Sequence, residues 1–355
     1  MLVFFLVISS LCNAGKSHGG VIKTVIILYM FSTVLAAVIA VFASMAFPVK
    51  MTLANAATDT SAPQGIVEVL NNLLLNVVAN PVSSLVNANY VGILMWAVLL
   101  GLAFRAADKM TKKVLADVAD GISMVVTWII NLAPFGIFGL VFNTVSTNGL
   151  DIFTTYGKLL LLLVGCMLFI YFVTNPLLVY WCIRQNPYPL IFQCLKRSAL
   201  TAFFTRSSAA NIPVNMKVCE EMGLDRDTYS VTIPLGATIN MDGAAITITV
   251  MTMATAFTLG IHVDIPTAII LSLLAALSAC GASGVAGGSL LLIPMACSLF
   301  GISDDISMQV VAVGFIIGVV QDSVETALNS SSDLLLSASA EFRQWRLEGK
   351  EIKFK

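Results

Sequence analysis

The stretch IPTAIILSLLAALSACGASGVAGGSLLLIPMACSLFGIS, residues 265–303, decides the fold, because it contains no Asp, Glu, Lys or Arg. A membrane-spanning helix needs about 20 apolar residues, so this run is too long for one span and too short for two spans and a turn. Its centre, residues 280–289, is rich in glycine, which permits a tight turn. We therefore predict a re-entrant hairpin over 265–303, with its tip covered by protein or facing a water-filled cavity.

The composition of the whole chain places this hairpin in a membrane protein. Hydrophobic residues make up 58% and charged residues 11% of the 355 residues, and the mean hydropathy is +0.91. A water-soluble domain carries about 25% charged residues. We expect an all-α polytopic membrane protein surrounded by lipid. A net charge of −1 without a basic patch argues against a nucleic-acid partner.

Cysteine and histidine patterns argue against a metal centre or a disulfide framework. The seven cysteines form no CxxC pair, and the chain has only two histidines. Basic residues instead predict the orientation, because short cytoplasmic loops are enriched in Lys and Arg. Most of them cluster on one side of the expected helices, and the tail 341–355 belongs to that side. The C-terminus is therefore expected in the cytoplasm.

Four membrane segments precede the hairpin region. We expect them at about 21–47, 65–104, 121–147 and 155–183, with an external loop over 48–64. The second is interrupted at Asn80-Pro81 and is expected to cross the membrane once in total. Residues 1–20 are interpreted as the remnant of an N-terminal membrane helix.

A second hairpin is expected over 195–222, around the polar centre TRSSAANIP at 205–213. Each hairpin precedes a span broken by polar residues. One runs over 228–258 with a break at Asn240-Met241-Asp242-Gly243, and the other runs over 304–340 with a break around Asn329 to Asp333. The order of hairpin, helix, hairpin, helix makes an inverted repeat, which is typical of secondary transporters.

Acidic residues inside the membrane segments are expected to bind cations. Each of Asp242, Asp322, Glu325 and Asp333 would cost about 2.5–3.5 kcal/mol unpaired, and Arg206 is the only internal base. A sodium ion or a substrate ammonium group is the natural partner.

Asp322, Thr326, Asn329 and Asp333 follow helical spacing and share one face; a set of helix caps or a polar seam is the alternative reading.

Oxygen and amide groups near these acids suggest what each could bind. Carbonyl oxygens of Gly236 and Asn240, together with the Asp333 carboxylate, are the hard ligands that an alkali ion requires. Ser207 and Ser208, at the N-terminus of a half-helix, suit a carboxylate. Simple helix capping is the alternative for this serine pair.

Four motifs together carry a resemblance to a known family. TRSSAANIPVN at 205–215, LGATINMDGAA at 235–245, CGASGVAGGS at 280–289 and QDSVETALNSSSD at 321–333 occur in the family's order. The chain thereby resembles the dicarboxylate/amino-acid:cation symporter family, in its serine/threonine:sodium symporter branch. The resemblance covers about residues 21–340.

The resemblance implies a glutamate-transporter-like fold of eight spans and two hairpins, assembled as a homotrimer. A transport domain then comprises 21–47, 155–194 and the core 195–345, and it moves against scaffold helices in 65–147. By the same likeness, this chain begins within the second helix of its relatives, so N-terminal scaffold helices are missing.

The resemblance also assigns ligands. The substrate ammonium would meet Asp322, with Thr326 and Asn329 nearby, and its carboxylate would meet Ser208 and Asn329. Tip residues Ser207, Gly284 and Val285 and the side chain of Glu325 complete the expected substrate site. Three transported Na+ ions would be held by these sets: Gly236, Asn240, Asn329 and Asp333; Thr238, Ala279, Cys280 and Ala282; and Tyr29, Ser32, Thr33, Asn240 and Asp242.

Two departures from the acidic-substrate members set the expected substrate. Those members have an arginine where this chain has Glu325, and tend to have a threonine where it has Ala244. Glu325 would repel a side-chain carboxylate and accept a hydrogen bond from a hydroxyl. We therefore expect sodium-coupled symport of serine and threonine across a cell inner (plasma) membrane. The alternative is a sodium- or proton-coupled carrier of another small amino acid or of a dicarboxylate.

Two other functional classes, an intramembrane protease and a channel, are alternatives to a carrier. Gly281-Ala282-Ser283-Gly284 has the form of the GxSG box of intramembrane serine proteases, but no histidine follows Ser283 to act as a base, so we expect no enzyme. Re-entrant hairpins also line channels, which conduct without coupling.

Overall fold

The computed structural model describes residues 20–53, 78–86, 90–131, 152–280 and 287–352, and the single positions 4, 5, 8, 9, 12, 75 and 282. Within these residues the regular structure is helical throughout and includes no strand. The expected all-α class is therefore confirmed. The main helices are α2 (Gly20–Ala46), α4 (Pro81–Val86), α5 (Tyr90–Ala103), α6 (Lys109–Asn131), α8 (Ile152–Phe169), α9 (Asn175–Ile183), α10 (Tyr188–Cys194), α11 (Leu200–Thr205), α12 (Ser208–Glu221), α13 (Arg226–Ile239), α14 (Asp242–Thr258), α15 (Ile265–Ala279), α16 (Ile293–Ser298) and α17 (Asp304–Leu347).

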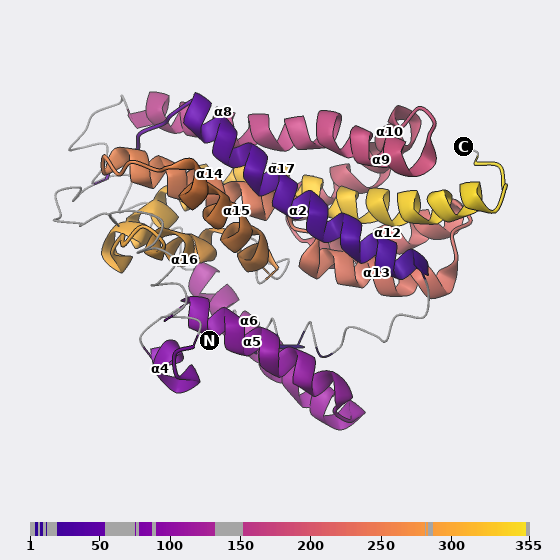
Figure 1. Cartoon of the computed structure of the whole chain (residues 1–355), viewed down its shortest axis with the longest axis horizontal. Helices are drawn as coiled ribbons and strands as arrows, with labels where there is room; N and C mark the ends of the chain where they lie inside the picture. The colour runs from indigo at the N-terminus through magenta and orange to yellow at the C-terminus, as the bar shows by residue number, and fades with distance from the viewer. Residues whose placement is uncertain are drawn as a thin grey trace.

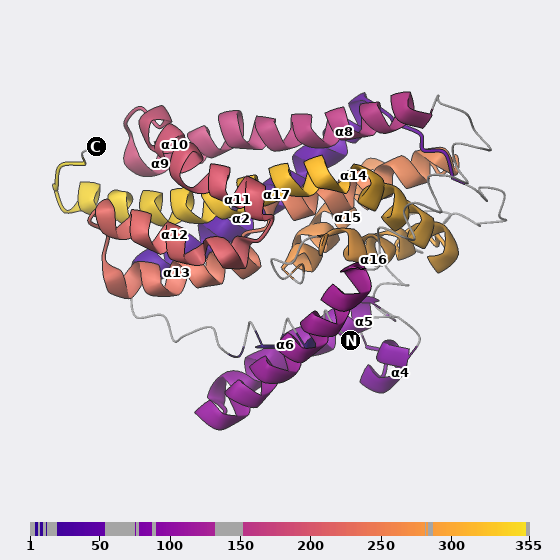
Figure 2. The ribbon, with the colours of Figure 1, turned by 180° about the vertical axis from the view of Figure 1, so that it is seen from behind.

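The helices form one elongated body, with α4 to α6 lying along one side of it (Figure 1). The reverse view shows α17 running lengthwise through this body among α8, α11, α12 and α14 (Figure 2). α17 also packs against α2, α9, α13 and α16. Because so many elements meet on one helix, the polar residues of α17 lie at the centre of the molecule.

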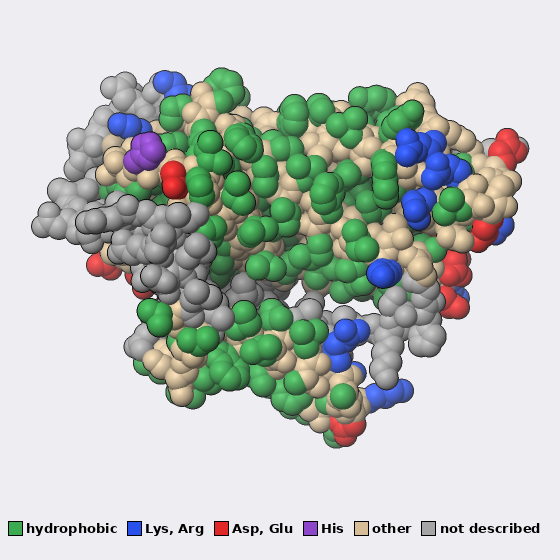
Figure 3. All heavy atoms as spheres, viewed as in Figure 1, with side chains coloured by type: hydrophobic (Ala, Val, Ile, Leu, Met, Phe, Trp, Pro, Cys, Tyr) green, Lys and Arg blue, Asp and Glu red, His purple; other side chains and the backbone are tan. Residues whose placement is uncertain are grey.

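The surface of the body matches a bilayer environment. Figure 3 shows hydrophobic side chains across the middle of the visible face and charged side chains mainly toward its ends. Four helical segments are long and apolar enough to cross a membrane, namely Gly20–Ala46, Tyr156–Ile183, Arg226–Thr258 and Asp304–Leu347, judged within the described residues. We conclude that the chain is a multi-pass membrane protein.

α2 has one small-residue face and one bulky face. It buries Ala36, Ala37 and Ala40, whereas Ile27 and Phe31 are more than half exposed. Small residues let two helix backbones approach closely in a membrane, and α2 packs along α14 and α15. This contact brings the hydroxyl groups of α2 to the start of α14.

The segment from α13 to α14 is interrupted within the tetrapeptide at which the sequence predicts a break. α13 ends at Ile239, and α14 begins at Asp242. Asn240 and Met241 leave the helical conformation, with ψ angles of 77° and 52°. The break places the first turn of α14 in the interior, since Asp242 and Gly243 are buried.

The segment around TRSS makes a sharp reversal between α11 and α12. Arg206 ends α11 with a left-handed φ of 50°. Ser207 then caps α12, because its side chain accepts a hydrogen bond from the backbone N–H of Ala210 at 3.2 Å. A π-helical stretch at Leu195–Ala199 links α10 to α11, so helix continues from Tyr188 to Thr205.

The charge-free run begins as α15 and ends as α16. Cys280 caps α15, a turn is described at Gly287 to Ser289, and a short 3-10 helix over Leu290–Leu292 leads into α16. The predicted tip residues Gly284 and Val285 lie outside the described residues.

Two predictions from the sequence are wrong, one about a break inside a helix and one about where a helix starts. α17 is continuous from Asp304 to Leu347, so the predicted interruption around Asn329 to Asp333 is absent. The stretch contains no Gly or Pro, and Ser331 donates to the Ala327 carbonyl oxygen at 2.5 Å within the helix. α6 starts at Lys109, well before the predicted start at 121, because Asp108 caps it through the N–H of Thr111 at 2.8 Å.

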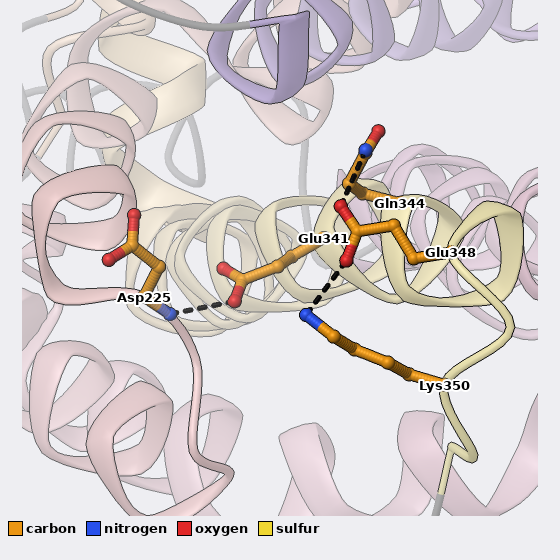
Figure 4. A network of polar contacts seen from close by, with 5 residues as sticks. All are labelled: Asp225, Glu341, Gln344, Glu348 and Lys350. Atoms are coloured by element: carbon orange, nitrogen blue, oxygen red, sulfur yellow. Dashed lines mark hydrogen bonds and ion pairs between the residues drawn. The ribbon is translucent and has the colours of Figure 1, made fainter.

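The C-terminal end of α17 is fixed by polar contacts (Figure 4). Glu341 Oε1 accepts a hydrogen bond from the backbone N–H of Asp225 at 2.7 Å, which ties the start of α13 to α17. About two turns on, Glu348 accepts from Gln344 at 2.8 Å and pairs with Lys350 at 2.7 Å. The Glu341 contact fixes the start of α13 against α17, and the Glu348 contacts hold the end of α17 itself.

Candidate functional site

The four acids predicted to bind cations are all buried. Asp242, Asp322, Glu325 and Asp333 are each no more than 5% exposed. Asp242 begins α14, and the other three lie along α17. Because α14 packs on α17, all four belong to one polar interior.

Asp242 is held by two hydroxyl groups of α2. Ser32 donates to Asp242 Oδ2 at 2.7 Å, and Thr33 Oγ1 lies 3.1 Å from Oδ1. Thr33 Oγ1 also lies 3.0 Å from the Tyr29 carbonyl oxygen and accepts from the Met241 N–H at 3.2 Å. Tyr29, Ser32, Thr33 and Asp242, which the resemblance groups around one ion, are therefore brought together.

Asp333 lies against the last turns of α13. Its Oδ1 accepts a hydrogen bond from Asn240 Nδ2 at 2.9 Å, and its carbonyl oxygen accepts from Tyr29 Oη at 2.8 Å. Gly236 fits closely beside it, because a Cβ there would lie 2.8 Å from Asp333 Oδ1 and 2.9 Å from Tyr29 Oη. A glycine at 236 is therefore required for this contact.

The Asn240–Asp333 pair leaves two buried oxygen atoms without a hydrogen-bond partner among the described residues. They are Oδ2 of Asp333 and Oδ1 of Asn240. A buried polar atom without a partner costs about 1–3 kcal/mol. Carboxylate and amide oxygens are also the hard ligands that an alkali cation takes, so this part of the chain suits a cation of that class.

Asn329 joins α17 to the first turn of α14. Its Oδ1 accepts from the backbone N–H of Gly243 at 2.7 Å, and its Nδ2 lies 3.5 Å from the Met241 sulfur. Gly243 also packs on Glu325, since a Cβ at 243 would lie 2.9 Å from Glu325 Cγ. Asn329 therefore holds the broken segment against the acids of α17.

Glu325 is the best-bonded of the acids. Its Oε2 accepts from Thr247 Oγ1 at 2.7 Å, Ser289 Oγ at 2.9 Å and Gln321 Nε2 at 2.5 Å. Gln321 Nε2 also donates to Thr247 Oγ1 at 2.7 Å. One carboxylate oxygen thus joins α14, α17 and the turn before α16.

Asp322 faces the same turn. Its Oδ1 accepts a hydrogen bond from the Gly287 N–H at 3.2 Å, and Arg206 exerts a Coulombic attraction on it. Thr326, one turn further along α17, is buried. Asp322 is therefore held at the turn by Gly287.

For the remaining predicted site residues, one or two features of the structure define the position of each. Ser208 is the first residue of α12 and is buried. Cys280 Sγ lies 3.8 Å from the Ile239 carbonyl oxygen, and Thr238 Oγ1 donates to the Leu235 carbonyl at 2.7 Å. The Ala282 N–H donates to the Ala279 carbonyl oxygen at 2.9 Å. The end of α15 thus lies beside the end of α13.

Sequence reasoning missed three residues of this interior: Thr247, Gln321 and Ser289. Gln321 and Ser289 stand at the ends of two of the quoted motifs, and Thr247 lies just past a third. Helical spacing could have marked Gln321, which precedes Glu325 by four residues on the same helix. Thr247 and Ser289 come from other segments, so their contact with Glu325 becomes apparent only in the folded chain.

Apolar helices around buried carboxylates, two of whose neighbouring oxygen atoms lack a partner among the described residues, are features of a membrane transporter that handles cations. The model of the Sodium:dicarboxylate symporter family matches residues 1–341, so the chain belongs to this family. The chain is 59% identical over 353 residues to the serine/threonine transporter SstT of Bifidobacterium adolescentis, a match that covers 99% of this chain and 82% of that protein. The family confirms the expected class, a transporter and not an enzyme.

Proposed function

We propose that this protein is a secondary active transporter that couples the entry of Na+ to the uptake of serine and threonine by alternating access. The observation that carries the proposal is a pair of buried oxygen atoms, on Asp333 and Asn240, that have no partner in the described part of the chain and that an alkali cation would satisfy. The 59% identity to a serine/threonine transporter supports the substrate class.

The first proposed Na+ site lies between α13 and α17. Its ligands are Gly236, Asn240, Asn329 and Asp333. Asp333 supplies the charge, and the unpaired Asn240 Oδ1 supplies a neutral oxygen. An ion that neutralises Asp333 removes the cost of its burial, so folding of the site and binding of the ion are coupled.

Two further Na+ sites are proposed. One uses the α2 hydroxyl groups around Asp242, with Tyr29, Ser32, Thr33 and Asn240 as its other members. Ser32 and Thr33 already contact the carboxylate, and their oxygens could turn to a cation. The other joins the ends of α13 and α15, which lie close together at Cys280 and Ile239, and its members are Thr238, Ala279, Cys280 and Ala282.

The substrate is proposed to bind between the two hairpins. Asp322 would accept its ammonium group, with Thr326 and Asn329 beside it. Ser207 and Ser208 would present the start of α12 to its carboxylate. Gly284 and Val285 complete the proposed site.

Glu325 is proposed to select for a neutral side chain. Two carboxylates about 6 Å apart repel by about 3 kcal/mol at an effective dielectric constant of 20, which corresponds to roughly a hundredfold in affinity. Aspartate and glutamate would therefore bind poorly. Because Glu325 Oε2 already accepts three donors, the hydroxyl of serine or threonine would reach Oε1.

Alternating access would use the inverted repeat of two re-entrant hairpins, 195–222 and 265–303. We propose that they belong with 21–47 and 155–194 to a transport domain that moves against scaffold helices in 65–147. The position of α4 to α6 along one side of the other helices agrees with that division (Figure 1). The proposal also includes a homotrimer in the cell inner membrane, with the tail 341–355 in the cytoplasm.

Uptake into proteoliposomes tests the function. An inward Na+ gradient is expected to drive radiolabelled serine above its equilibrium level, and unlabelled threonine is expected to compete. With equal Na+ on both sides, serine should only equilibrate. Accumulation that does not depend on Na+, or competition by aspartate at the same concentration as serine, would contradict the proposal. The same assay separates a carrier from a channel, which cannot accumulate serine against its gradient.

A further inference from the structure

The turn Gly287–Ser289 is attached to α17 at two points. The Gly287 N–H donates to Asp322 Oδ1 at 3.2 Å, and Ser289 Oγ donates to Glu325 Oε2 at 2.9 Å. Asp322 and Glu325 are three residues apart on a helix, so they share one face. Two neighbouring carboxylates therefore hold two nearby residues of a single turn.

Close packing supports this attachment. Gly287 has a left-handed φ of 73°, and a Cβ there would lie 2.9 Å from the Phe315 ring. Next to the turn, Leu290 lies so close to α17 that a Cβ on Gly314 would be 2.6 Å from its Cδ2. The turn therefore lies directly on α17.

Ser289 donates to a carboxylate that the protein already holds in place. Thr247 and Gln321 donate to the same Oε2, and they come from α14 and α17. Ser289 itself is 1% exposed, so water does not compete for its hydroxyl group. Loss of this hydroxyl would remove the polar link between the turn and the Glu325 network.

We propose that Ser289 is a positioning residue for the substrate site, which holds the Gly287 N–H on Asp322 by anchoring the turn to Glu325. This inference rests on the proposed function, in which Asp322 accepts the substrate ammonium. A hydrogen bond from Gly287 fixes the direction of the Asp322 carboxylate, and a carboxylate held in one orientation binds an ammonium more tightly than a rotating one. Ser289 acts through the turn and need not touch the substrate.

A series of substitutions at Ser289 tests the inference. Ser289→Ala is expected to raise the KM for serine about tenfold, the effect of losing one hydrogen bond to a charged group, while Vmax changes less than twofold. Ser289→Thr keeps the hydroxyl group and is expected to restore the KM. Ser289→Cys carries a weak donor and is expected to fall between them.

The matched control is Ser272→Ala. Ser272 is also 1% exposed, but its hydroxyl donates only to the Ala268 carbonyl oxygen of its own helix, at 3.0 Å. This variant is expected to keep the wild-type KM. The thermal melting temperature of each variant shows whether it folds, and if Ser289→Ala does not fold, Ser289→Cys takes its place.

Several outcomes would overturn the inference. They are a KM within twofold of wild type in Ser289→Ala, an equal rise in Ser272→Ala, or a KM in Ser289→Thr as high as in the alanine variant. Absence of Na+-driven serine uptake by the unsubstituted protein would instead reject the proposed function. The wild-type measurement therefore separates the two failures.

Discussion

Replacement of Gly236 by alanine would test the proposed first Na+ site with a single methyl group. A Cβ at this position would lie 2.8 Å from Asp333 Oδ1, 2.9 Å from Asp333 Cγ and 2.9 Å from Tyr29 Oη. Real Cβ atoms do not approach other heavy atoms so closely, so Asp333 or α13 must shift. Overpacking of a buried site costs typically about 1–3 kcal/mol.

The size of the effect follows from where that strain is relieved. Asp333 is tied on one side by Asn240 and through its backbone by Tyr29, so a shift of the carboxylate or of α13 disturbs the proposed ion site. If the strain weakens the free energy of Na+ binding by about 1–2 kcal/mol, the Na+ concentration for half-maximal serine uptake rises about 5- to 30-fold. Uptake measured over a series of Na+ concentrations gives this value directly.

A matched glycine provides the control. Gly165 lies in α8, and a Cβ there would have no atom within 4 Å. Gly165→Ala is expected to leave the Na+ dependence unchanged and to raise the melting temperature slightly, because alanine restricts the unfolded chain. If Gly236→Ala showed the wild-type Na+ dependence and melting temperature, the close packing of Asp333 on Gly236 would be refuted.

Three further predictions concern the same interior. Asp322→Asn is expected to abolish serine uptake while a Na+-dependent rise in melting temperature persists; serine uptake at the wild-type KM would exclude Asp322 as the ammonium acceptor. Glu325→Gln is expected to strengthen the competition of aspartate with serine at least tenfold, up to roughly a hundredfold; unchanged competition would remove Glu325 from the selectivity argument. Replacement of Na+ by choline is expected to lower the melting temperature, because an ion at a hundred times its Kd stabilises the fold by about 2.7 kcal/mol; an identical melting temperature in both salts would argue against resident Na+.

The sequence predicted membrane helices best in two long apolar stretches that carry one charged residue each. α2 lies almost on the predicted 21–47, and α8 with α9 covers the predicted 155–183. Apolar length alone decides such helices, because about 20 residues cross a bilayer. Prediction of a break succeeded at Asn240–Gly243 and failed at Asn329–Asp333. The two segments are similarly polar, but only the first contains a glycine and follows a proline, at 234.

The candidate site was predicted residue by residue, but its contacts were not. Glu325 meets Thr247 and Ser289 across sequence separations of 78 and 36 residues. Spacing along one helix places Asp322, Glu325 and Asp333 on α17, and it carries no information about which other helix supplies the donors. Those partners depend on how α14 and the turn at 287–289 pack on α17, which only the folded chain defines.

The four buried acids differ in how many hydrogen bonds the protein itself donates to them, and this difference indicates how far the burial of each depends on a bound cation. An ionised carboxylate can accept about four hydrogen bonds. Glu325 accepts three on one oxygen, and Asp242 has a hydroxyl group at each oxygen. Asp333 accepts one side-chain donor and keeps a buried Oδ2 without a partner among the described residues.

A bound cation stabilises a buried carboxylate most where the protein itself donates the fewest hydrogen bonds to it. Asp333 is therefore the acid whose burial most depends on an ion, and its substitution should act on coupling to Na+. Glu325 is stabilised by the protein's own donors from three segments, so its substitution should act on selectivity and on the Gly287–Ser289 turn while Na+ dependence remains. Because these two consequences are measured in the same uptake assay, the ranking of the acids by their donors can be tested directly.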